Sequence, residues 1–133
     1  MNLTTLIRIR CGYIAAFGDA AVFIIFATLG SEEHNIILTQ SLIRTGLPFL
    51  VVWFAITPLF GMYNQSFLEK SRKSILIIMV IWPLCAIIAL GIRNVVTEQN
   101  TNLSFVVISF LIQGSLLGAW RYTFAKLLKL FCR

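Results

Sequence analysis

Five side chains of this sequence could do chemistry in an apolar setting, because each lies in or beside a long apolar run. Asp19 stands inside the stretch "AAFGDAAVFIIF", and Arg44 stands inside a second apolar run. Arg93 and Gln113 stand in two more, and His34 is the one histidine of the chain. If these runs cross a membrane, a charged residue at a helix centre costs about 2.5–3.5 kcal/mol and usually faces a partner inside the protein.

The spacing predicts that Asp19 and Arg44 form a buried charge pair. Asp19 precedes Gly30 by 11 residues, which is ~16 Å along a helix. Arg44 follows Ile36 by 8 residues, or ~12 Å from the same end of a neighbouring helix. A structural pair of this kind fixes helix register, and the alternative is that the two side chains contact a solute.

Two further groups are candidates for polar or close helix contacts. His34 and Arg93 are expected to form a polar cluster on the outer side. Gln113 is the one strongly polar side chain of its apolar run, and Gly114 and Gly118 beside it form a Gly-x-x-x-Gly pattern. Such residues are typical of interhelical hydrogen bonds and close helix packing, so we expect both uses here.

Motifs for catalysis or metal binding are missing from the sequence. The cysteines Cys11, Cys85 and Cys132 have no metal-ligand spacing, and one histidine cannot form a paired site. No nucleophile, base and orienting group can be assembled, and no phosphate-binding glycine loop is present. The sequence therefore identifies no catalytic residue, no metal site and no cofactor.

The composition identifies the lipid bilayer as the solvent of this chain. Of 133 residues, 59% are hydrophobic and 12% are charged, whereas soluble domains contain about 25% charged residues. A soluble fold of this length leaves ~30% of its chain surface in water and could not hide so much apolar area. The net charge is +6, but aromatic and basic residues do not alternate as on a nucleic-acid surface, so we expect no nucleic-acid partner.

The chain is predicted to be an all-α integral membrane protein with four transmembrane helices in one antiparallel bundle. A membrane helix needs ~20 mostly apolar residues, and four segments qualify, at about 11–29, 36–63, 74–93 and 103–122. Short polar segments join them, as expected between antiparallel neighbours. Residues 1–133 thus form a single transmembrane domain with a basic tail at 123–133.

The basic residues predict that both termini face the cytoplasm. Cytoplasmic loops of membrane proteins carry an excess of Lys and Arg. Arg44 and Arg93 alone lie on the opposite side. The other nine lie at the two termini and the second loop, namely Arg8, Arg10, Lys70, Arg72, Lys73, Arg121, Lys126, Lys129 and Arg133.

The order of several short motifs resembles a known family. The motifs are "GDAAVFIIFATLG", a histidine in the first loop, "RTGLPFLVVWF", "GIR" in the third span, "SFVVISFL" and a closing "WR". Together they resemble the bacterial and archaeal family catalogued as domain of unknown function 3054. The resemblance implies a small four-helix protein of the prokaryotic cytoplasmic or a related energy-transducing membrane, and it supplies no substrate. It marks Gly18, Asp19, Gly30, His34, Arg44, Pro48, Phe49, Trp53, Arg93, Trp120 and Arg121.

Three functional classes stay open at this point. The first is a non-enzymatic accessory or scaffold subunit of a membrane assembly, either a homo-oligomer or part of a larger complex. The second is an oligomeric transporter or channel for a small solute, an ion or a proton, using Asp19, Arg44 and Arg93. The third, an intramembrane enzyme acting on a lipid or isoprenoid, has the weakest support because the sequence contains no catalytic set.

Overall fold

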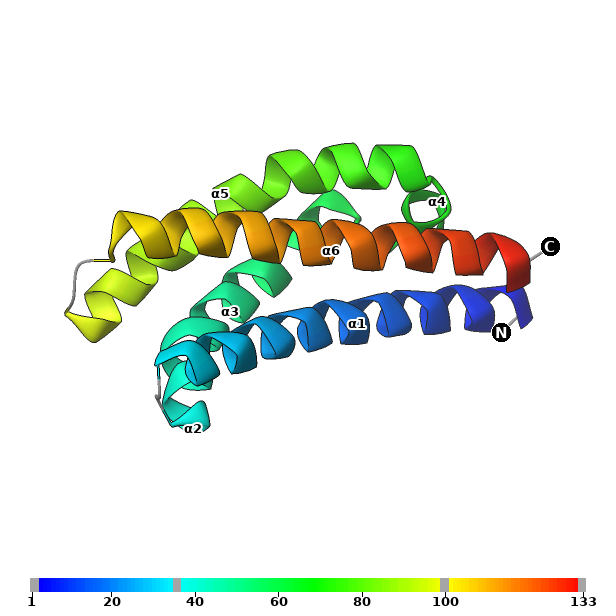
Figure 1. Cartoon of the computed structure of the whole chain (residues 1–133). Coiled ribbons are helices and arrows are strands. Elements are labelled where there is room, and N and C mark those ends of the chain that lie inside the picture. Colours follow the sequence, from blue (N-terminus) through cyan, green and yellow to red (C-terminus); the bar gives the residue numbers. More distant parts are fainter. Residues whose placement is uncertain (1–2, 35–36, 99–100, 132–133) are drawn as a thin grey trace.

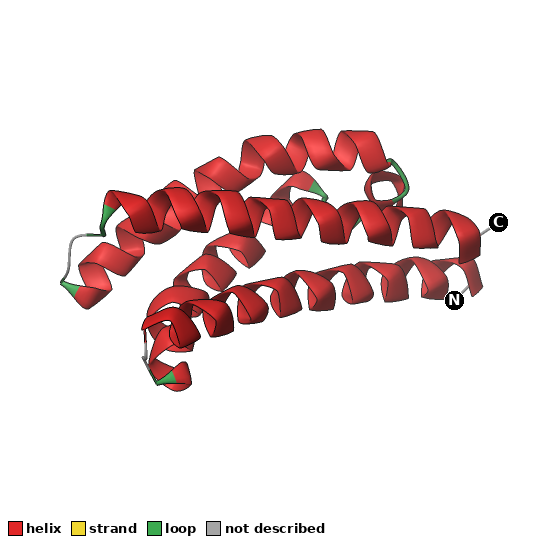
Figure 2. Ribbon diagram, in the orientation of Figure 1, coloured by secondary structure: helices red, strands yellow, loops and turns green. Residues whose placement is uncertain are grey.

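The computed structural model describes residues 3–34, 37–98 and 101–131. Within those ranges every regular element is a helix, as Figure 1 and Figure 2 show. Four helices are long and apolar enough to cross a membrane. The predicted fold class, an all-α bundle of four membrane helices, is therefore confirmed.

Three of the four membrane helices are continuous. They are α1 (Leu3–His34), α5 (Ser71–Thr97) and α6 (Leu103–Phe131). All three extend beyond the predicted spans, because an apolar run marks the thickness of the bilayer and not the point where the hydrogen-bonded helix stops. Their membrane-spanning parts are Ile9–Gly30, Arg72–Thr97 and Leu103–Leu130.

The second membrane span, Leu38–Phe60, is built from four short helical pieces. Pro48 explains the first irregularity, since it has no N–H to donate to the carbonyl of Arg44 and its ring clashes there. The backbone widens into a π-helix immediately before this proline. In chain order the pieces are α2 (Leu38–Ser41), the π-helix η1 (Leu42–Gly46), α3 (Leu47–Ile56) and the 3₁₀ helix η2 (Thr57–Phe60).

The second span ends in a tight turn that leads the chain toward α4 and α5. Pro58 occupies the first turn of η2, and Gly61 ends it with φ of +63°, a left-handed conformation that favours glycine. The turn buries Met62 completely and leaves Tyr63 half-buried. The short helix α4 (Gln65–Leu68) then leads into α5.

The four spans form a closed bundle, because the first and last helices pack against each other in addition to their neighbours in the chain. Helix α6 packs against both α5 and α1, and α3 packs against α5 (Figure 1). Near its C-terminal end α1 also contacts α2 and η1. The beginning of α1 and the end of α6 lie side by side at one end of the bundle, as antiparallel packing requires.

Aromatic rings from three helices fill the middle of the bundle. Trp82 of α5 has its ring centroid 5.7 Å from that of Phe49, 6.0 Å from that of Phe23 and 6.2 Å from that of Trp53. All four side chains are at most 2% exposed. The Trp82 N–H donates to the carbonyl of Phe110 at 3.1 Å and so ties α5 to α6. The cluster gives the bundle a rigid centre next to the polar site described below.

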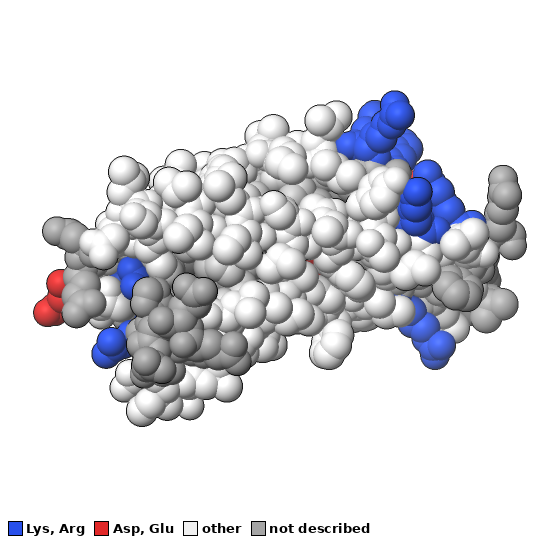
Figure 3. Space-filling model, in the orientation of Figure 1, with Lys and Arg blue, Asp and Glu red and all other residues white. Residues whose placement is uncertain are grey.

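Charged side chains gather at the two ends of the molecule, with an uncharged belt between them (Figure 3). The end that holds both termini carries most of the Lys and Arg side chains that the view shows. This distribution fits a belt surrounded by lipid, and it is the pattern on which the predicted orientation rests. The orientation itself stays a prediction.

Candidate functional site

The candidate site is the carboxylate of Asp19, which is completely buried in the middle of α1. Its Oδ1 accepts a hydrogen bond from Arg121 Nε at 2.9 Å, and its Oδ2 forms an ion pair with Arg121 Nη2. Oδ2 also accepts hydrogen bonds from Trp53 Nε1 at 3.0 Å and from the Tyr63 hydroxyl at 2.9 Å. Four protein hydrogen bonds therefore converge on one carboxylate.

Arg121 completes the site from the opposite helix, and its side chain is 2% exposed. Its Nη1 donates to the backbone carbonyl of Met62 at 3.0 Å, and its guanidinium lies 4.9 Å from the centre of the Tyr63 ring. Two guanidinium nitrogens of Arg121 bind the two carboxylate oxygens of Asp19, which suits the planar fork of the guanidinium group. A bidentate contact between charged groups is stronger than a single hydrogen bond between neutral groups. All three guanidinium nitrogens thus have acceptors.

Each part of the site is delivered by a different element. Asp19 comes from α1, Trp53 from α3 and Arg121 from α6. Tyr63 comes from the turn after the second span, and burial followed by the negative charge of Asp19 raises the pKa of its hydroxyl above the usual range. The hydroxyl is therefore protonated at neutral pH and donates to the carboxylate. The hydrogen bonds of the site therefore link α1, α3 and α6 with the turn that follows the second span.

The predicted partner of Asp19 was wrong, because the structure pairs Asp19 with Arg121 and not with Arg44. Arg44 lies in η1 and is exposed. The second span begins at Leu38, so Arg44 is only six residues, or ~9 Å, from its outer end. Asp19 is ~16 Å from the corresponding end of its own span at Gly30. The two side chains are at different depths.

Depth measured from the other end of the bundle identifies the true partner. Asp19 follows Ile9, the first residue of its span, by ten residues, or ~15 Å. Arg121 precedes Leu130, the last residue of its span, by nine residues, or ~14 Å. Because α1 and α6 are packed antiparallel, these positions are level. Sequence reasoning missed Arg121 because it ended the fourth span at residue 122 and counted this arginine as an anchor at the membrane surface.

Arg93 has partners of its own away from the Asp19 site. Arg93 is half-buried, donates to the Thr101 hydroxyl at 2.9 Å and lies 4.7 Å from the centre of the Phe105 ring. Arg44 is six residues from Leu38, where the second span begins, and Arg93 is four residues from Thr97, where the third span ends. The side chain of His34 is outside the residues that the structure describes.

The three candidates on α6 have different surroundings. Gln113 is 1% exposed, and neither atom of its amide has a partner among the described residues. A Cβ at Gly114 would lie 3.0 Å from two ring atoms of Trp82, so this glycine allows α5 and α6 to approach closely. A Cβ at Gly118 would meet nothing within 4 Å. The Gly-x-x-x-Gly pattern thus packs at one glycine and faces open space at the other.

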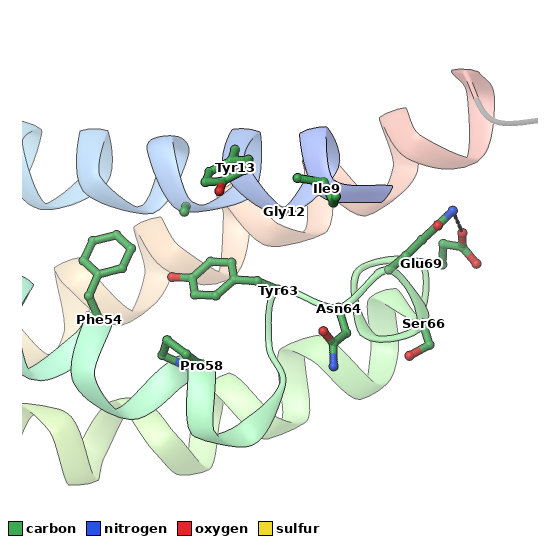
Figure 4. A pocket seen from close by; sticks show the side chains of 11 residues that line it. Ile9, Gly12, Tyr13, Phe54, Pro58, Tyr63, Asn64, Ser66 and Glu69 are labelled. Atoms are coloured by element: carbon green, nitrogen blue, oxygen red, sulfur yellow. Dashed lines mark hydrogen bonds between the residues drawn. The ribbon is translucent and has the colours of Figure 1, made fainter. Parts of the chain in front are cut away.

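A groove opens beside the Asp19 site at the end of the molecule that carries both termini. It has a volume of about 720 Å³ and lies between α1 on one side and η2, the turn and α4 on the other (Figure 4). Tyr63 forms part of its wall and also donates to Asp19. The buried carboxylate is therefore separated from the groove by one side chain.

Chemically, the Asp19 site is a buried ion pair whose charged atoms have protein partners. Both carboxylate oxygens and all three guanidinium nitrogens are engaged by protein groups. In the described part of the chain no three His, Cys, Asp or Glu side chains are grouped so that they could hold a metal ion. Trp53 and Tyr63 were not predicted as site residues, and only the resemblance marked Trp53 and Arg121.

Comparison with known proteins identifies a family and nothing more specific. No curated protein and no solved structure matches the chain. A family model described as a protein of unknown function (DUF3054) matches residues 16–124. This range contains Asp19, Trp53, Tyr63 and Arg121, so the whole buried site lies inside the matched region. The chain therefore belongs to the DUF3054 family of proteins of unknown function.

Proposed function

We propose that this integral membrane protein is a non-enzymatic accessory or scaffold subunit of a membrane assembly. The observation that carries the proposal is the closed Asp19–Arg121 pair, whose members are 0% and 2% exposed. A carboxylate that serves a solute must be accessible to it, whereas Asp19 is completely buried and both of its oxygens accept hydrogen bonds from the protein. A pair of this kind holds helices in register.

The outward face of α6 supports association with another membrane helix. This helix has the smallest buried share of the four spans, with 17% of its most apolar stretch buried against 39% for α1. Ser115 and Ala119 are exposed there, and Gly118 between them has open space. Small residues let helix backbones approach closely in lipid, where packing rather than the hydrophobic effect drives association. We therefore propose that a second copy or a larger complex packs on this face.

The distribution of Lys and Arg supports a location in the prokaryotic cytoplasmic membrane with both termini inside. Arg10 is exposed near the start of α1, and Lys126 and Lys129 are exposed near the end of α6. The positive-inside rule assigns the end with these residues to the cytoplasm. Reporter fusions at residues 68 and 99 should report opposite sides of the membrane, and the same answer from both would contradict this orientation.

Native mass spectrometry after mild detergent extraction tests the assembly. We expect a defined complex, and we expect Gly118→Leu to dissociate it while leaving the unfolding midpoint unchanged. Gly91→Leu is the matched control, because a Cβ at Gly91 also meets nothing within 4 Å and this glycine is exposed on α5. A monomer in every membrane mimic, or equal loss from both variants, would contradict a specific α6 contact.

Transport is the second candidate function, and one observation favours it. The groove reaches Tyr63, and the Tyr63 hydroxyl donates to Asp19 at 2.9 Å. A proton or small solute in the groove would therefore need to displace one side chain to reach the carboxylate. Flux into proteoliposomes separates the two functions, since a subunit of an assembly should match empty liposomes. A flux that Asp19→Asn abolishes without unfolding the protein would favour transport.

A further inference from the structure

The groove described above has an apolar inner part and a polar mouth. Ala16 of α1, Phe54 of α3 and Pro58 of η2 line the inner part. Asn64, Gln65, Ser66 and Glu69 line the mouth (Figure 4). Its volume of about 720 Å³ falls in the range of natural ligand sites, ~300–1,000 Å³. The lining therefore fits a ligand with one apolar and one polar end.

The groove also crosses the boundary between the hydrocarbon and the headgroup region. Ile9, the first residue of the first membrane span, lines it, and so does Ala16, seven residues or ~10 Å deeper. Asn64 follows the last residue of the second span, Phe60, by four positions. The polar mouth is thus level with lipid headgroups, and the apolar part is level with acyl chains. On its outer side Tyr13, 72% exposed, faces the surrounding lipid.

The one charged residue among those that line the groove is the acidic Glu69, and exposed basic residues lie beside the lining residues in the chain. Arg10 is adjacent in the chain to the groove residue Ile9, and Lys70 is adjacent to Glu69. Lys73 follows within the first turn of α5, and all three basic side chains are exposed. Long basic side chains at a membrane boundary extend toward headgroups, and each attracts an anionic lipid by about 1 kcal/mol near the surface.

The mouth also offers acceptors that a bare phosphate would not satisfy. The Oε1 atom of Gln65 is buried and has no hydrogen-bond partner among the described residues. The Nε2 atom of the same side chain donates to Glu69 at 2.6 Å, which holds the amide in place. A headgroup that combines a phosphate with hydroxyl donors would satisfy both the basic residues beside the mouth and the exposed carboxylate of Glu69, which lines it.

We propose that the groove binds one molecule of an anionic glycerophospholipid with a hydroxylated headgroup. One acyl chain lies along Ala16 and Phe54, and the headgroup lies at Glu69 beside the basic side chains of Lys70 and Lys73. Phosphatidylglycerol has this chemistry and is the probe for the test. The proposal does not depend on whether the protein is a subunit or a transporter.

Native mass spectrometry with added lipid tests the site. We expect one tightly retained phosphatidylglycerol, bound at least tenfold more tightly than phosphatidylcholine or phosphatidylethanolamine. Ala16→Leu should fill the inner groove and remove this preference. Ala55→Leu is the matched control, because Ala55 is exposed on α3 and does not line the groove. Equal retention of all three lipids, or an unchanged preference in Ala16→Leu, would overturn the proposal.

Two further arms keep the proposal testable if Ala16→Leu does not fold. Lys70→Gln combined with Lys73→Gln should weaken phosphatidylglycerol binding several-fold, whereas Arg44→Gln at the opposite end should not. A phosphatidylglycerol with a photoreactive acyl chain should crosslink to residues 9–16 of the unaltered protein. Crosslinks confined to α6, or the same loss from the charge change at Arg44, would assign the lipid to the general boundary layer and contradict the groove.

Discussion

Two buried polar side chains, Arg121 and Gln113, lie two turns apart on α6 and differ in their hydrogen-bond partners. Arg121 is 2% exposed and donates three hydrogen bonds, two to Asp19 and one to the Met62 carbonyl. Gln113 is 1% exposed and has no partner among the described residues. A buried charge without partners costs far more than a buried amide without partners. The bundle therefore satisfies the charge completely and leaves the amide unpaired.

The neighbours of each side chain explain the difference. Arg121 faces an acid on α1 and a turn whose carbonyl and tyrosine are both within reach. Beside Gln113, Gly114 contacts the Trp82 ring, but the N–H of that ring donates to the Phe110 carbonyl. Polar partners are thus concentrated at one level of the membrane. The contrast predicts a graded series of effects on stability.

The largest effect should come from breaking the charge pair on one side. Arg121→Met leaves Asp19 buried with no counter-charge, and it also removes the donor to the Met62 carbonyl. Such a loss costs about 3–5 kcal/mol. We expect the free energy of unfolding, measured by SDS titration in mixed micelles, to fall by this amount. Arg44→Gln is the control and should change it by less than about 0.5 kcal/mol, because an exposed side chain away from the site contributes little.

Removing both charges together should restore much of that loss. In Asp19→Leu combined with Arg121→Met no unpaired charge is left, and apolar replacements of buried ion pairs are often neutral. The double-mutant cycle should therefore deviate from additivity by at least about 1 kcal/mol. Strict additivity would mean that the two side chains do not interact in the membrane, and the structural role proposed for the pair would be lost.

A smaller effect is expected from the two donors that complete the carboxylate. Trp53→Phe removes the N–H donor to Asp19, and Tyr63→Phe removes the hydroxyl donor, while both keep an aromatic ring. Hydrogen bonds inside membrane proteins average ~0.6 kcal/mol and reach ~1.7, and a charged acceptor places these two near the upper value. Each variant should lose about 1–2 kcal/mol. Phe23→Leu, a change of similar size in the same aromatic cluster that touches no hydrogen bond, controls for ring packing.

Two glycines with different surroundings, Gly18 on α1 and Gly118 on α6, allow a comparison of close packing with open space. At Gly18, next to Asp19, an added Cβ would lie 1.8 Å from a ring atom of Trp120, so the indole must move. Overpacking of this kind costs about 1–3 kcal/mol. At Gly118 an added Cβ meets nothing within 4 Å, and alanine is the better helix former by about 1 kcal/mol. For the protein held as a monomer in detergent, Gly18→Ala should lower the unfolding midpoint and Gly118→Ala should not, and a loss from the second variant would mean that Gly118 is packed within the bundle.

Composition and periodicity were enough to predict the number and class of the membrane helices, because hydropathy alone determines what crosses lipid. They could not predict the pairing of Asp19, since pairing depends on which helices are adjacent and at what depth. Consecutive spans were assumed to supply the partner, but α6 is also a neighbour of α1 and holds Arg121 at the level of Asp19. The contribution of Tyr63 depends on the left-handed turn at Gly61, which no apolar pattern records. Comparing depths from both membrane boundaries could have identified Arg121.

The smallest effect on stability should come from replacing Gln113, whose buried amide has no partner among the described residues. Gln113→Leu removes two polar atoms that have no partner among the described residues and keeps a side chain of similar length. Replacing an unsatisfied buried group by an apolar one recovers its desolvation cost, so stability should stay within about 0.5 kcal/mol or rise. Ser109→Ala, one turn away, removes a hydroxyl that also has no partner among the described residues, and it should behave in the same way. If Gln113→Leu lowers the free energy of unfolding by more than about 1 kcal/mol, the amide binds a water molecule or a partner in the membrane. Gln113 and Arg121 would then differ in the kind of partner that each binds, and both would have one.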